Sequence, residues 1–439
     1  MAERTLFGTD GVRGRANVDL TPEMAFGMAA AAGEDDDGPA VIGRDTRRSS
    51  PMFSAALQAG FNSVGVDTVD LGIIPVGGVS RLTRDVGATY GVMVSASHNP
   101  AADNGIKFFG RDGSKLTDER EAGLEARYRR GYPWSRAEGA FIGVHSVMTD
   151  ASDRYADSLL AKKQYSLRGI ELTLDCANGA AFLVAPKVFE AAGAGIDVIH
   201  AEPDGMNIND ECGATDVRSL AKAANGKVGF AFDGDADRLI AVDEDGSVVN
   251  GDVILAIFAR HLQERGKLKK DLVVATVMAN LGFHKAMQTL GVNVVETPVG
   301  DRYVLEQMRK TRAVLGGEQS GHIILEDRAT GDGIRTAHRL AEVMAATGKE
   351  LRELREVMTE FPQVLVNVPV HDRELLPKAG AVWSAVRAAE ERLGDKGRIL
   401  LRASGTESLV RVMAEAETQA MAEDVVGDLA KIVEASLGR

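Results

Sequence analysis

The apolar positions of the chain fall into short runs typical of strands and longer runs with helical spacing. Residues 39–45, 66–72 and 87–97 are short apolar runs bounded by turn-forming residues, which predicts strands, whereas residues 50–65 have the spacing of a helix. Strands that alternate with helices favour an α/β architecture.

This alternation returns twice further along the chain. The predicted elements are a strand entering a turn at 170–181, a helix at 185–194, a strand–loop–strand segment at 228–246, a helix at 251–262, and strands at 271–280 and 292–298. The last part of the chain differs, because its apolar runs predict strands at 364–370, 398–405 and 409–416 and a long helix at 379–394.

A chain of 439 residues exceeds what one hydrophobic core usually supports, so we expect several domains. The pattern predicts three α/β domains and a smaller C-terminal α+β domain, with the divisions 1–147, 148–247, 248–362 and 363–439.

The bulk composition excludes several classes of protein. The net charge of −13 leaves no excess of cations to neutralise nucleic acid or an anionic membrane surface. With 2 cysteines and no run of about 18 apolar residues, the chain predicts neither a disulfide framework nor a membrane span. Its first residues lack the apolar core of a signal peptide, so we expect a cytoplasmic protein.

The strongest chemical signal is the segment FAFDGDADR. Asp233, Asp235 and Asp237 follow an apolar strand and are separated only by small residues, so the loop can curl and bring the carboxylates together. Crowded carboxylates repel one another unless a cation lies among them, which predicts a site for a hard divalent ion such as Mg²⁺. Glu244 has the spacing of the last ligand in an EF-hand loop, but Arg238 stands where that loop needs glycine, and the flanks predict strands.

An alternative from a different enzyme class uses the same loop. An apolar strand that ends in Asp-x-Asp also resembles the first motif of haloacid-dehalogenase phosphatases, in which the first aspartate is the nucleophile. That motif normally opens its domain and continues to Thr or Val, whereas Asp233 lies deep in the chain and Asp237 follows. A metal-dependent phosphatase with Asp233 as nucleophile therefore stays an alternative.

A second polar segment, VSASHNPAADNGIKFF, contains Ser97 at the end of an apolar run. It lacks the G-x-S-x-G pattern of a hydrolase nucleophile elbow. A serine that carries a phosphoryl group needs a cation for the phosphate and a group that moves a proton. The aspartate loop would hold the cation, and Lys107 or His322 would move the proton, so we interpret Ser97 as a phosphoserine.

Two further segments suit a phosphosugar, although each is a weak signal when taken alone. Glu318, Ser320 and His322 alternate around a glycine and could read sugar hydroxyls, but a glycine-rich turn explains them equally well. A guanidinium, hydroxyls and an exposed turn suit a tetrahedral phosphate in RASGTESLVR, which contains Arg402, Ser404, Gly405, Thr406 and Arg411.

Four segments in one order resemble the α-D-phosphohexomutases. They are SASHNP, DGDADR, GEQSGH and RASGTE, and they extend the resemblance over essentially the whole chain. Within that superfamily, FGTDGVRG, NINDECGATDVRSL, TPVGDRYVLEQ and the glutamine of GEQSGH are most similar to the members that act on glucosamine phosphates.

The resemblance implies a four-domain, heart-shaped molecule with a central cleft, built from three related α/β domains and a smaller C-terminal α+β domain. Ser97 matches the phosphorylated serine. Asp233, Asp235 and Asp237 match the ligands of one Mg²⁺ per chain, and a phosphate oxygen on Ser97 completes the set.

The resemblance also implies roles for the remaining site residues. Lys107 matches a residue proposed as general base, and Arg13 and Arg238 match groups near the transferred phosphoryl group. Glu318 and Ser320 match the pair that reads the sugar, with His322 beside them. The loop that grips the phosphate that is not transferred is matched by Arg402, Ser404, Gly405, Thr406 and Arg411.

The implied reaction interconverts glucosamine 6-phosphate and glucosamine 1-phosphate, which is an isomerase activity of amino-sugar metabolism that feeds UDP-N-acetylglucosamine and peptidoglycan precursors. Phospho-Ser97 would pass its phosphoryl group to the sugar, and a trace of sugar 1,6-bisphosphate would prime the serine. A mutase that prefers glucose or mannose phosphates is the alternative within the superfamily. The expected partner is a small phosphosugar, with no nucleic acid and no membrane, and a homodimer is the assembly to test.

Overall fold

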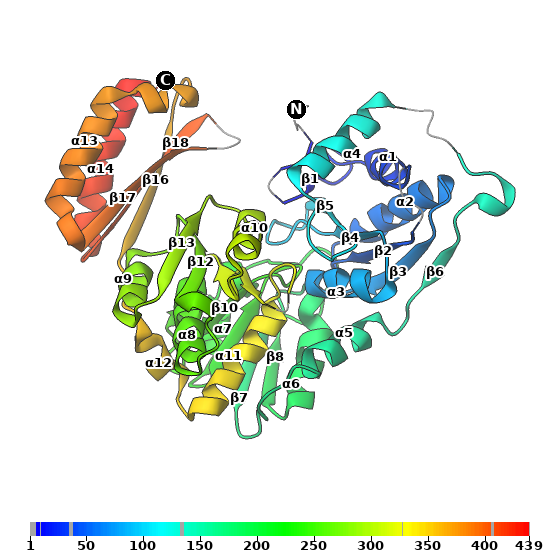
Figure 1. Ribbon diagram of the computed structural model, residues 1–439, viewed down its shortest axis with the longest axis horizontal. Helices are drawn as coiled ribbons and strands as arrows, with labels where there is room; N and C mark the ends of the chain where they lie inside the picture. The colour runs from blue at the N-terminus through cyan, green and yellow to red at the C-terminus, as the bar shows by residue number, and fades with distance from the viewer. Residues whose placement is uncertain are drawn as a thin grey trace. The chain divides into compact units, whose positions relative to one another are not determined.

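The computed structural model describes residues 6–8, 10–34, 38–131, 136–326, 328–404 and 408–438. The chain forms two compact units, of which the first comprises Met1–Met278 with Val292–Val357 and the second Ala279–Gly291 with Met358–Arg439. Figure 1 shows mixed sheets covered by helices in the first unit and an antiparallel sheet with helices in the second. The predicted α/β fold class, with an α+β region at the C-terminus, is confirmed.

The first sheet carries the serine segment at the end of one of its strands. β4 lies between β5 and β2, parallel to β2 and antiparallel to β5, so the chain after β4 leaves at the edge where the parallel strands end. In hydrogen-bonded order the strands are β1 (Val12–Arg15), β5 (Asp103–Phe109), β4 (Tyr90–Val94), β2 (Ala40–Arg44), β3 (Thr68–Ile73) and β6 (His145–Val147). The helices are α1 (Pro22–Gly33), α2 (Ser50–Ser63), α3 (Val76–Val86) and α4 (Asp118–Arg130).

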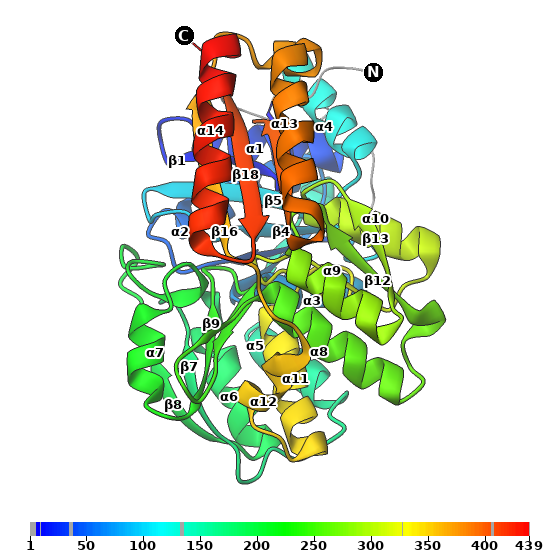
Figure 2. The same ribbon diagram turned by 90° about the vertical axis from the view of Figure 1, so that its left-hand side faces the viewer.

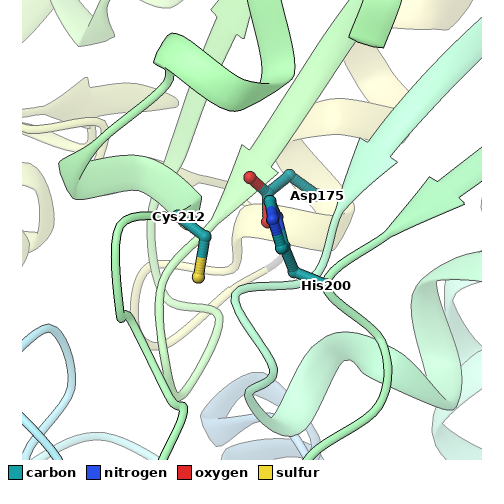
Figure 3. Close-up of side chains that lie close together, drawn as sticks. All are labelled: Asp175, His200 and Cys212. Atoms are coloured by element: carbon teal, nitrogen blue, oxygen red, sulfur yellow. The ribbon is translucent and has the colours of Figure 1, made fainter.

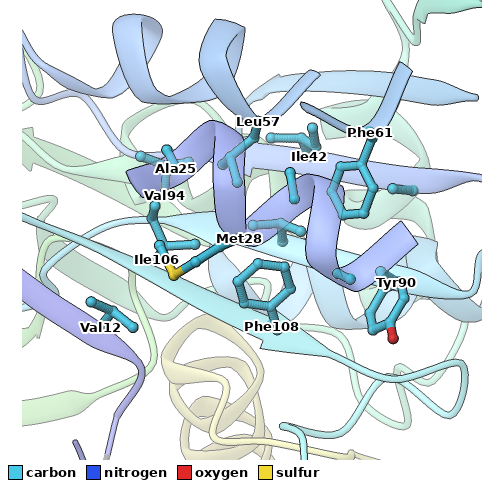
Figure 4. Packing of buried hydrophobic residues seen from close by; sticks show 14 of the residues in the cluster. Val12, Ala25, Met28, Ile42, Leu57, Phe61, Tyr90, Val94, Ile106 and Phe108 are labelled. Atoms are coloured by element: carbon cyan, nitrogen blue, oxygen red, sulfur yellow. The ribbon is translucent and has the colours of Figure 1, made fainter. Parts of the chain in front are cut away.

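The core of this region lies between the sheet and the group of helices α1, α2 and α4 (Figure 4). Met28 of α1 and Phe61 of α2 are buried against Ile42, Tyr90 and Phe108 of the sheet. The Tyr90 and Phe108 rings meet edge to face with their centroids 6.3 Å apart. Each such side chain contributes about 1.5–3 kcal/mol through burial of its apolar surface. Helix α3 packs against β2 and β4.

The second sheet positions the aspartate segment. The predicted strands on either side of it are confirmed as β9 and β10, which form an antiparallel hairpin next to the parallel strands β7 and β8. In order the strands are β11 (Val248–Val249), β10 (Leu239–Val242), β9 (Val228–Phe232), β7 (Glu171–Asp175) and β8 (Gly195–Ile199), with helices α5 (Ala151–Leu160), α6 (Val184–Ala192) and α7 (Arg218–Ala224).

The third sheet positions the glutamate–serine–histidine segment in the turn between β14 and β15. In order its strands are β13 (Asn293–Thr297), β12 (Leu272–Thr276), β14 (Leu315–Gly317) and β15 (Ile323–Leu325). The helices of this region are α8 (Gly251–Glu264), α10 (Asp301–Thr311), α11 (Gly333–Thr347) and α12 (Leu351–Leu354).

The second unit is an antiparallel sheet covered by helices. Figure 2 shows α13 and α14 side by side over the sheet, and the core between these layers contains Val382, Val412 and Val433. Its strands in order are β16 (Gln363–Pro369), β18 (Leu409–Ala416) and β17 (Gly397–Ala403), and its helices are α9 (Leu281–Leu290), α13 (Gly380–Leu393) and α14 (Gln419–Leu437). Within the described residues, no helix is both long and apolar enough to cross a membrane.

The contact between α1 and α2 depends on Gly60. A Cβ at this position would overlap the carbonyl oxygen of Phe26 and lie 2.8 Å from the Cβ of Ala29. We expect Gly60→Ala to lower the free energy of unfolding by about 1–3 kcal/mol, because overpacking outweighs the better helix propensity of alanine. Denaturant titration measures this change. The control is Gly123→Ala on α4, where the nearest atom is 3.8 Å from the new Cβ, and which should stabilise the protein slightly. A stabilising Gly60→Ala would contradict the packing argument.

Candidate active site

Ser97 lies in the loop between β4 and β5 and is 1% exposed. Its backbone has φ +52°, a left-handed conformation that is uncommon for a residue other than glycine. The Ser97 amide donates to the Oγ of Ser95 at 2.9 Å, and the Ser97 carbonyl accepts from the Nδ2 of Asn209 at 2.9 Å. These contacts hold the backbone in a conformation that aims the hydroxyl out of the loop.

The guanidinium of Arg47 is fully buried and binds the backbone carbonyls of the loop that carries Ser97. We call this contact the loop clamp. Nη2 donates to the carbonyls of Ser97 at 3.0 Å and Asn99 at 2.7 Å, and Nη1 donates to the carbonyl of Asp103 at 3.0 Å. Nε donates to the carboxylate of Asp45 at 2.8 Å, which balances the charge. In the sequence, Arg47 lies in the basic segment GRDTRRSS, which has no pattern that indicates burial, so the sequence did not predict this role.

The three aspartates are buried together in the turn between β9 and β10. One carboxylate oxygen from each of Asp233, Asp235 and Asp237 lies within 4.8 Å of the other two. Gly234 between them allows the loop to approach the serine segment, because a Cβ there would overlap the carbonyl oxygen of Ser97. The structure therefore brings the three aspartates close together and places their loop against the loop that carries Ser97.

The Ser97 hydroxyl donates to Oδ2 of Asp233 at 2.5 Å, and the Nδ1 of His98 lies 3.3 Å from the same hydroxyl. Burial, followed by the charges of Asp237 and Asp235, raises the pKa of Asp233 to about 8. Burial also lowers the pKa of His98 to about 4, assisted by the cations Arg238 and Arg13, so His98 is neutral near pH 7.

The donor set of the aspartate loop fits a hard cation. The Oδ1 atoms of Asp235 and Asp237 are buried without a hydrogen-bond partner. Unpartnered carboxylate oxygens are costly in a protein interior, and oxygens are the ligands that Mg²⁺ prefers. The residues that would hold the ion are Asp233, Asp235 and Asp237, together with an oxygen on Ser97.

Lys107 comes from β5 and places its ammonium group beside these carboxylates. Its Nζ lies 2.7 Å from Oδ2 of Asp235, 2.8 Å from Oδ2 of Asp10 and 3.8 Å from Oδ2 of Asp237. Burial alone would lower the pKa of Lys107, but these three carboxylates raise it above its ordinary value. Lys107 is therefore a cation in this arrangement, which suits charge neutralisation. Its role as general base stays a prediction.

A series of ionic contacts connects Lys107 to His322 through Asp10, Lys115 and Asp301. The sequence did not indicate this series. Lys115 contacts Asp10, and its Nζ lies 2.6 Å from Oδ2 of Asp301 at the start of α10. Burial would raise the pKa of Asp10, but Lys107, Lys115 and an arginine lower it well below its ordinary value. Asp10 and Asp301 lie in the segments FGTDGVRG and TPVGDRYVLEQ, but nothing in the sequence links either residue to Lys115, and only the fold brings the three together.

His322 is the last residue of this series of contacts and lies between two carboxylates. Its Nδ1 lies 3.4 Å from Oδ2 of Asp237 and its Nε2 lies 3.4 Å from Oδ2 of Asp301. Burial lowers the pKa of His322, but Asp237 and Asp301 raise it to about 9. The amide of Gly331 donates to Nε2 at 2.9 Å, which favours the neutral ring with its proton on Nδ1. The two carboxylates favour the protonated ring, whereas the Gly331 amide needs a lone pair on Nε2, so the two influences oppose each other.

Glu318 and Ser320 lie in the β14–β15 turn and are half-buried. Oε1 of Glu318 accepts from the amide of Gly300 at 3.0 Å, and the Ser320 hydroxyl lies 3.5 Å from Oε2 of Glu318. The amide of Leu239 donates to the carbonyl of Gly321 at 3.0 Å, which joins this turn to the end of the aspartate loop.

Arg13 and Arg238 add positive charge around the serine. Nη1 of Arg13 donates to the Ala96 carbonyl at 3.2 Å and to Oδ1 of Asn99 at 3.3 Å, so Arg13 lies against the serine loop. Nε of Arg238 lies 3.8 Å from Oδ1 of Asp237. The structure thus places Arg13 beside the serine loop and Arg238 beside the aspartate loop, and their roles at the phosphoryl group stay predictions.

The second unit contains the remaining predicted residues. Arg402 of β17 and Arg411 of β18 are paired directly across the antiparallel sheet. Burial, followed by the charge of Arg411, lowers the pKa of Arg402. Ser404 is buried at the end of β17, and its carbonyl accepts from Nη1 of Arg373 at 2.7 Å. Gly405 and Thr406 lie outside the described residues.

Comparisons with known proteins agree with this arrangement. Family models of phosphoglucomutase/phosphomannomutase match the chain with alpha/beta/alpha domain I at residues 4–133, domain II at 153–246, domain III at 250–361 and the C-terminal domain at 365–432. The chain is 50% identical to phosphoglucosamine mutase of Salinispora arenicola (strain CNS-205) over 439 residues, which cover 97% of each chain. The chain belongs to the phosphoglucosamine mutase family. It is therefore a phosphohexomutase, an isomerase that transfers a phosphoryl group.

Solved structures share the fold of this family. A phosphoglucomutase/phosphomannomutase family protein from Burkholderia thailandensis is 23% identical with a TM-score of 0.82, covering 99% of this chain and 98% of that one. N-acetylphosphoglucosamine mutase of Aspergillus fumigatus, in complex with GlcNAc-6P and magnesium, is 20% identical with a TM-score of 0.70, covering 99% and 96%.

Arg47 offers a test of the loop clamp in this phosphoglucosamine mutase family member. We expect Arg47→Met to lower the free energy of unfolding by about 3–5 kcal/mol, because Asp45 and several loop carbonyls lose their buried partner. Denaturant titration followed by circular dichroism measures the loss. Arg81→Met on α3 is the control, since its ion pair with Asp85 is 32% and 42% exposed and should contribute little. Equal small effects of the two substitutions would contradict the clamp.

Proposed function

We propose that this chain interconverts glucosamine 6-phosphate and glucosamine 1-phosphate, with Ser97 as the carrier of the phosphoryl group. The observation that carries the proposal is the 2.5 Å hydrogen bond from the Ser97 hydroxyl to Asp233, inside a cluster of carboxylates that fits a divalent cation. The substrate follows from the relatives of this chain, which carry the name phosphoglucosamine mutase at about half identity over nearly their full length.

Each half-reaction exchanges one P–O bond for another. The bond between phosphorus and Oγ of Ser97 breaks while a bond forms from phosphorus to the free hydroxyl of the sugar, and the hydroxyl proton passes to a nearby base. The sugar 1,6-bisphosphate then returns its other phosphoryl group to Oγ in the reverse sense. A trace of 1,6-bisphosphate would prime the unphosphorylated serine.

Phosphoryl transfer depends mainly on positioning and on neutralising negative charge. Mg²⁺, one ion per chain, would supply charge neutralisation at the aspartate loop when bound. Arg13 and Arg238 would stabilise the transferred group from the sides, because both guanidinium groups lie beside the serine and aspartate loops. Lys107 or His322 would take or return the proton.

The non-reacting parts of the substrate would be held by other loops. We assign the sugar hydroxyls to Glu318 and Ser320, which are half-buried on one turn. We assign the phosphate that is not transferred to Arg402, Ser404, Gly405, Thr406 and Arg411. Arg402 and Arg411 lie side by side on adjacent strands, and two adjacent cations favour a doubly charged anion. We propose a cytoplasmic enzyme that acts on small phosphosugars, with a homodimer as the assembly to test by ultracentrifugation.

Ser97→Ala tests the phosphoserine. Loss of a covalent nucleophile should reduce mutase turnover by a factor on the order of 10³ or more. The measurement is conversion of glucosamine 6-phosphate in the presence of Mg²⁺ and a trace of 1,6-bisphosphate. Ser80→Ala is the matched control, because it removes an equally buried hydroxyl that bonds to the Gly113 carbonyl. Full mutase turnover of Ser97→Ala would overturn the role of Ser97, and release of inorganic phosphate that survives the substitution would favour the phosphatase that uses Asp233.

A substrate series tests the named sugar. We expect a higher kcat/KM for glucosamine 6-phosphate than for glucose 6-phosphate or mannose 6-phosphate under the same conditions. A preference for glucose or mannose phosphate would keep the phosphoserine mechanism and reject the amino sugar. Release of inorganic phosphate without isomerisation would reject the mutase reaction itself.

A further inference from the structure

A second cluster of metal-ligating side chains lies in the second sheet region, on residues that the phosphoryl-transfer site does not use. Asp175 is the last residue of β7, His200 follows the end of β8, and Cys212 precedes a short turn at Gly213–Thr215 (Figure 3). One ligand atom from each residue lies within 4.8 Å of the other two. Because β7 and β8 are adjacent and parallel, their carboxyl ends bring these residues to the same edge of the sheet.

Asp175 is oriented by hydrogen bonds from backbone amides. The amide of Ala177 donates to its Oδ1 at 2.9 Å and the amide of Gly213 donates to its Oδ2 at 2.9 Å. Each oxygen has a second lone pair left for another partner. Such hydrogen bonds to a carboxylate are the support that metal ligands receive in proteins. The bond to Gly213 also fixes the segment that carries Cys212.

His200 faces Asp175 across the cluster. Its Nδ1 lies 3.0 Å from Oδ1 of Asp175. At this separation the two atoms can share either a proton or a metal ion. His200 also has φ +48°, and its carbonyl accepts from the amide of Asn178 at 2.6 Å, so the backbone holds the ring in place.

We infer that Asp175, His200 and Cys212 form a zinc site. Carboxylate oxygen, imidazole nitrogen and thiolate sulfur are all zinc ligands, whereas a thiolate is a poor ligand for Mg²⁺ or Ca²⁺. On binding, the S–H bond of Cys212 breaks, a sulfur–zinc bond forms and the proton leaves to solvent. A water molecule completes the tetrahedron, and it has access because the His200 side chain is 30% exposed.

The site would stabilise the loops that support Ser97. Asn209, three residues before Cys212, donates from its amide to the Ala177 carbonyl at 3.0 Å and from Nδ2 to the Ser97 carbonyl at 2.9 Å. Zinc would therefore tie together the segments that flank Asn209. The inference does not depend on the proposed substrate.

Cobalt spectroscopy distinguishes this site from the aspartate loop, because only a sulfur ligand gives a thiolate-to-cobalt charge-transfer band in the near ultraviolet. The purified chain, freed of metal with a chelator and saturated with Mg²⁺, is titrated with Co²⁺. We expect the band to reach saturation at one Co²⁺ per chain and to disappear when Zn²⁺ displaces the cobalt. No band in the folded protein would overturn the inference.

Variants locate the ligands. Cys212→Ser should abolish the band, and His200→Asn should weaken Co²⁺ binding on the order of 100-fold. Asparagine suits this position because it tolerates a left-handed backbone. The matched control is Cys176→Ser, which removes the other buried thiol, adjacent to Asp175 but outside the cluster, and should keep the band. A band that survives Cys212→Ser and disappears in Cys176→Ser would overturn the assignment, and His200→Asn keeps the test decisive if Cys212→Ser does not fold.

Discussion

The crowding of negative charge in the aspartate loop is the constraint on which the active site depends. Asp233, Asp235 and Asp237 are buried within a few ångströms of one another, an arrangement that would be strongly unfavourable unless cations surrounded it. Gly234 allows the backbone of this loop to touch the backbone that carries Ser97. A phosphoryl group on Ser97 would add further negative charge at this point, so a divalent cation and flanking guanidinium groups are needed by the same reasoning.

The compensating charges come from all three sheets of the first unit. Lys107 lies on the first sheet, and the aspartates lie in a turn of the second. His322 lies in a turn of the third sheet, and Asp301 begins α10 in the same region. Ion pairs connect these regions to one another. Buried ion pairs are expensive to desolvate and seldom improve stability over apolar packing. Their presence here is explained by chemistry, because phosphoryl transfer needs fixed charges that do not have to reorganise during the reaction.

Two clusters of side chains that could hold a metal ion, both among the described residues, differ in their donor atoms. The aspartate loop offers only oxygen and lies against the reactive serine. The Asp175, His200 and Cys212 cluster mixes oxygen, nitrogen and sulfur and lies on the loops that support that serine. The first suits a hard cation such as Mg²⁺, and the second suits a borderline cation such as Zn²⁺.

The order of strands and helices was readable from the sequence because side-chain periodicity is a local property, and the strands around the aspartate loop were predicted correctly. Ser97 and the aspartates were also identifiable, since polar residues after apolar strands and carboxylates separated by small residues are local patterns. By contrast, Arg47 and Lys115 lie in segments without any distinguishing pattern, and the segments of Asp10 and Asp301 do not show which partners these two residues have. Their importance comes from burial and from partners distant in the chain, such as Asp10 and Lys115, which are separated by more than a hundred residues. Sequence by itself therefore determined the elements and the reactive groups. Only the tertiary structure decided which charges surround them, because long-range ion pairs depend on how the sheets pack.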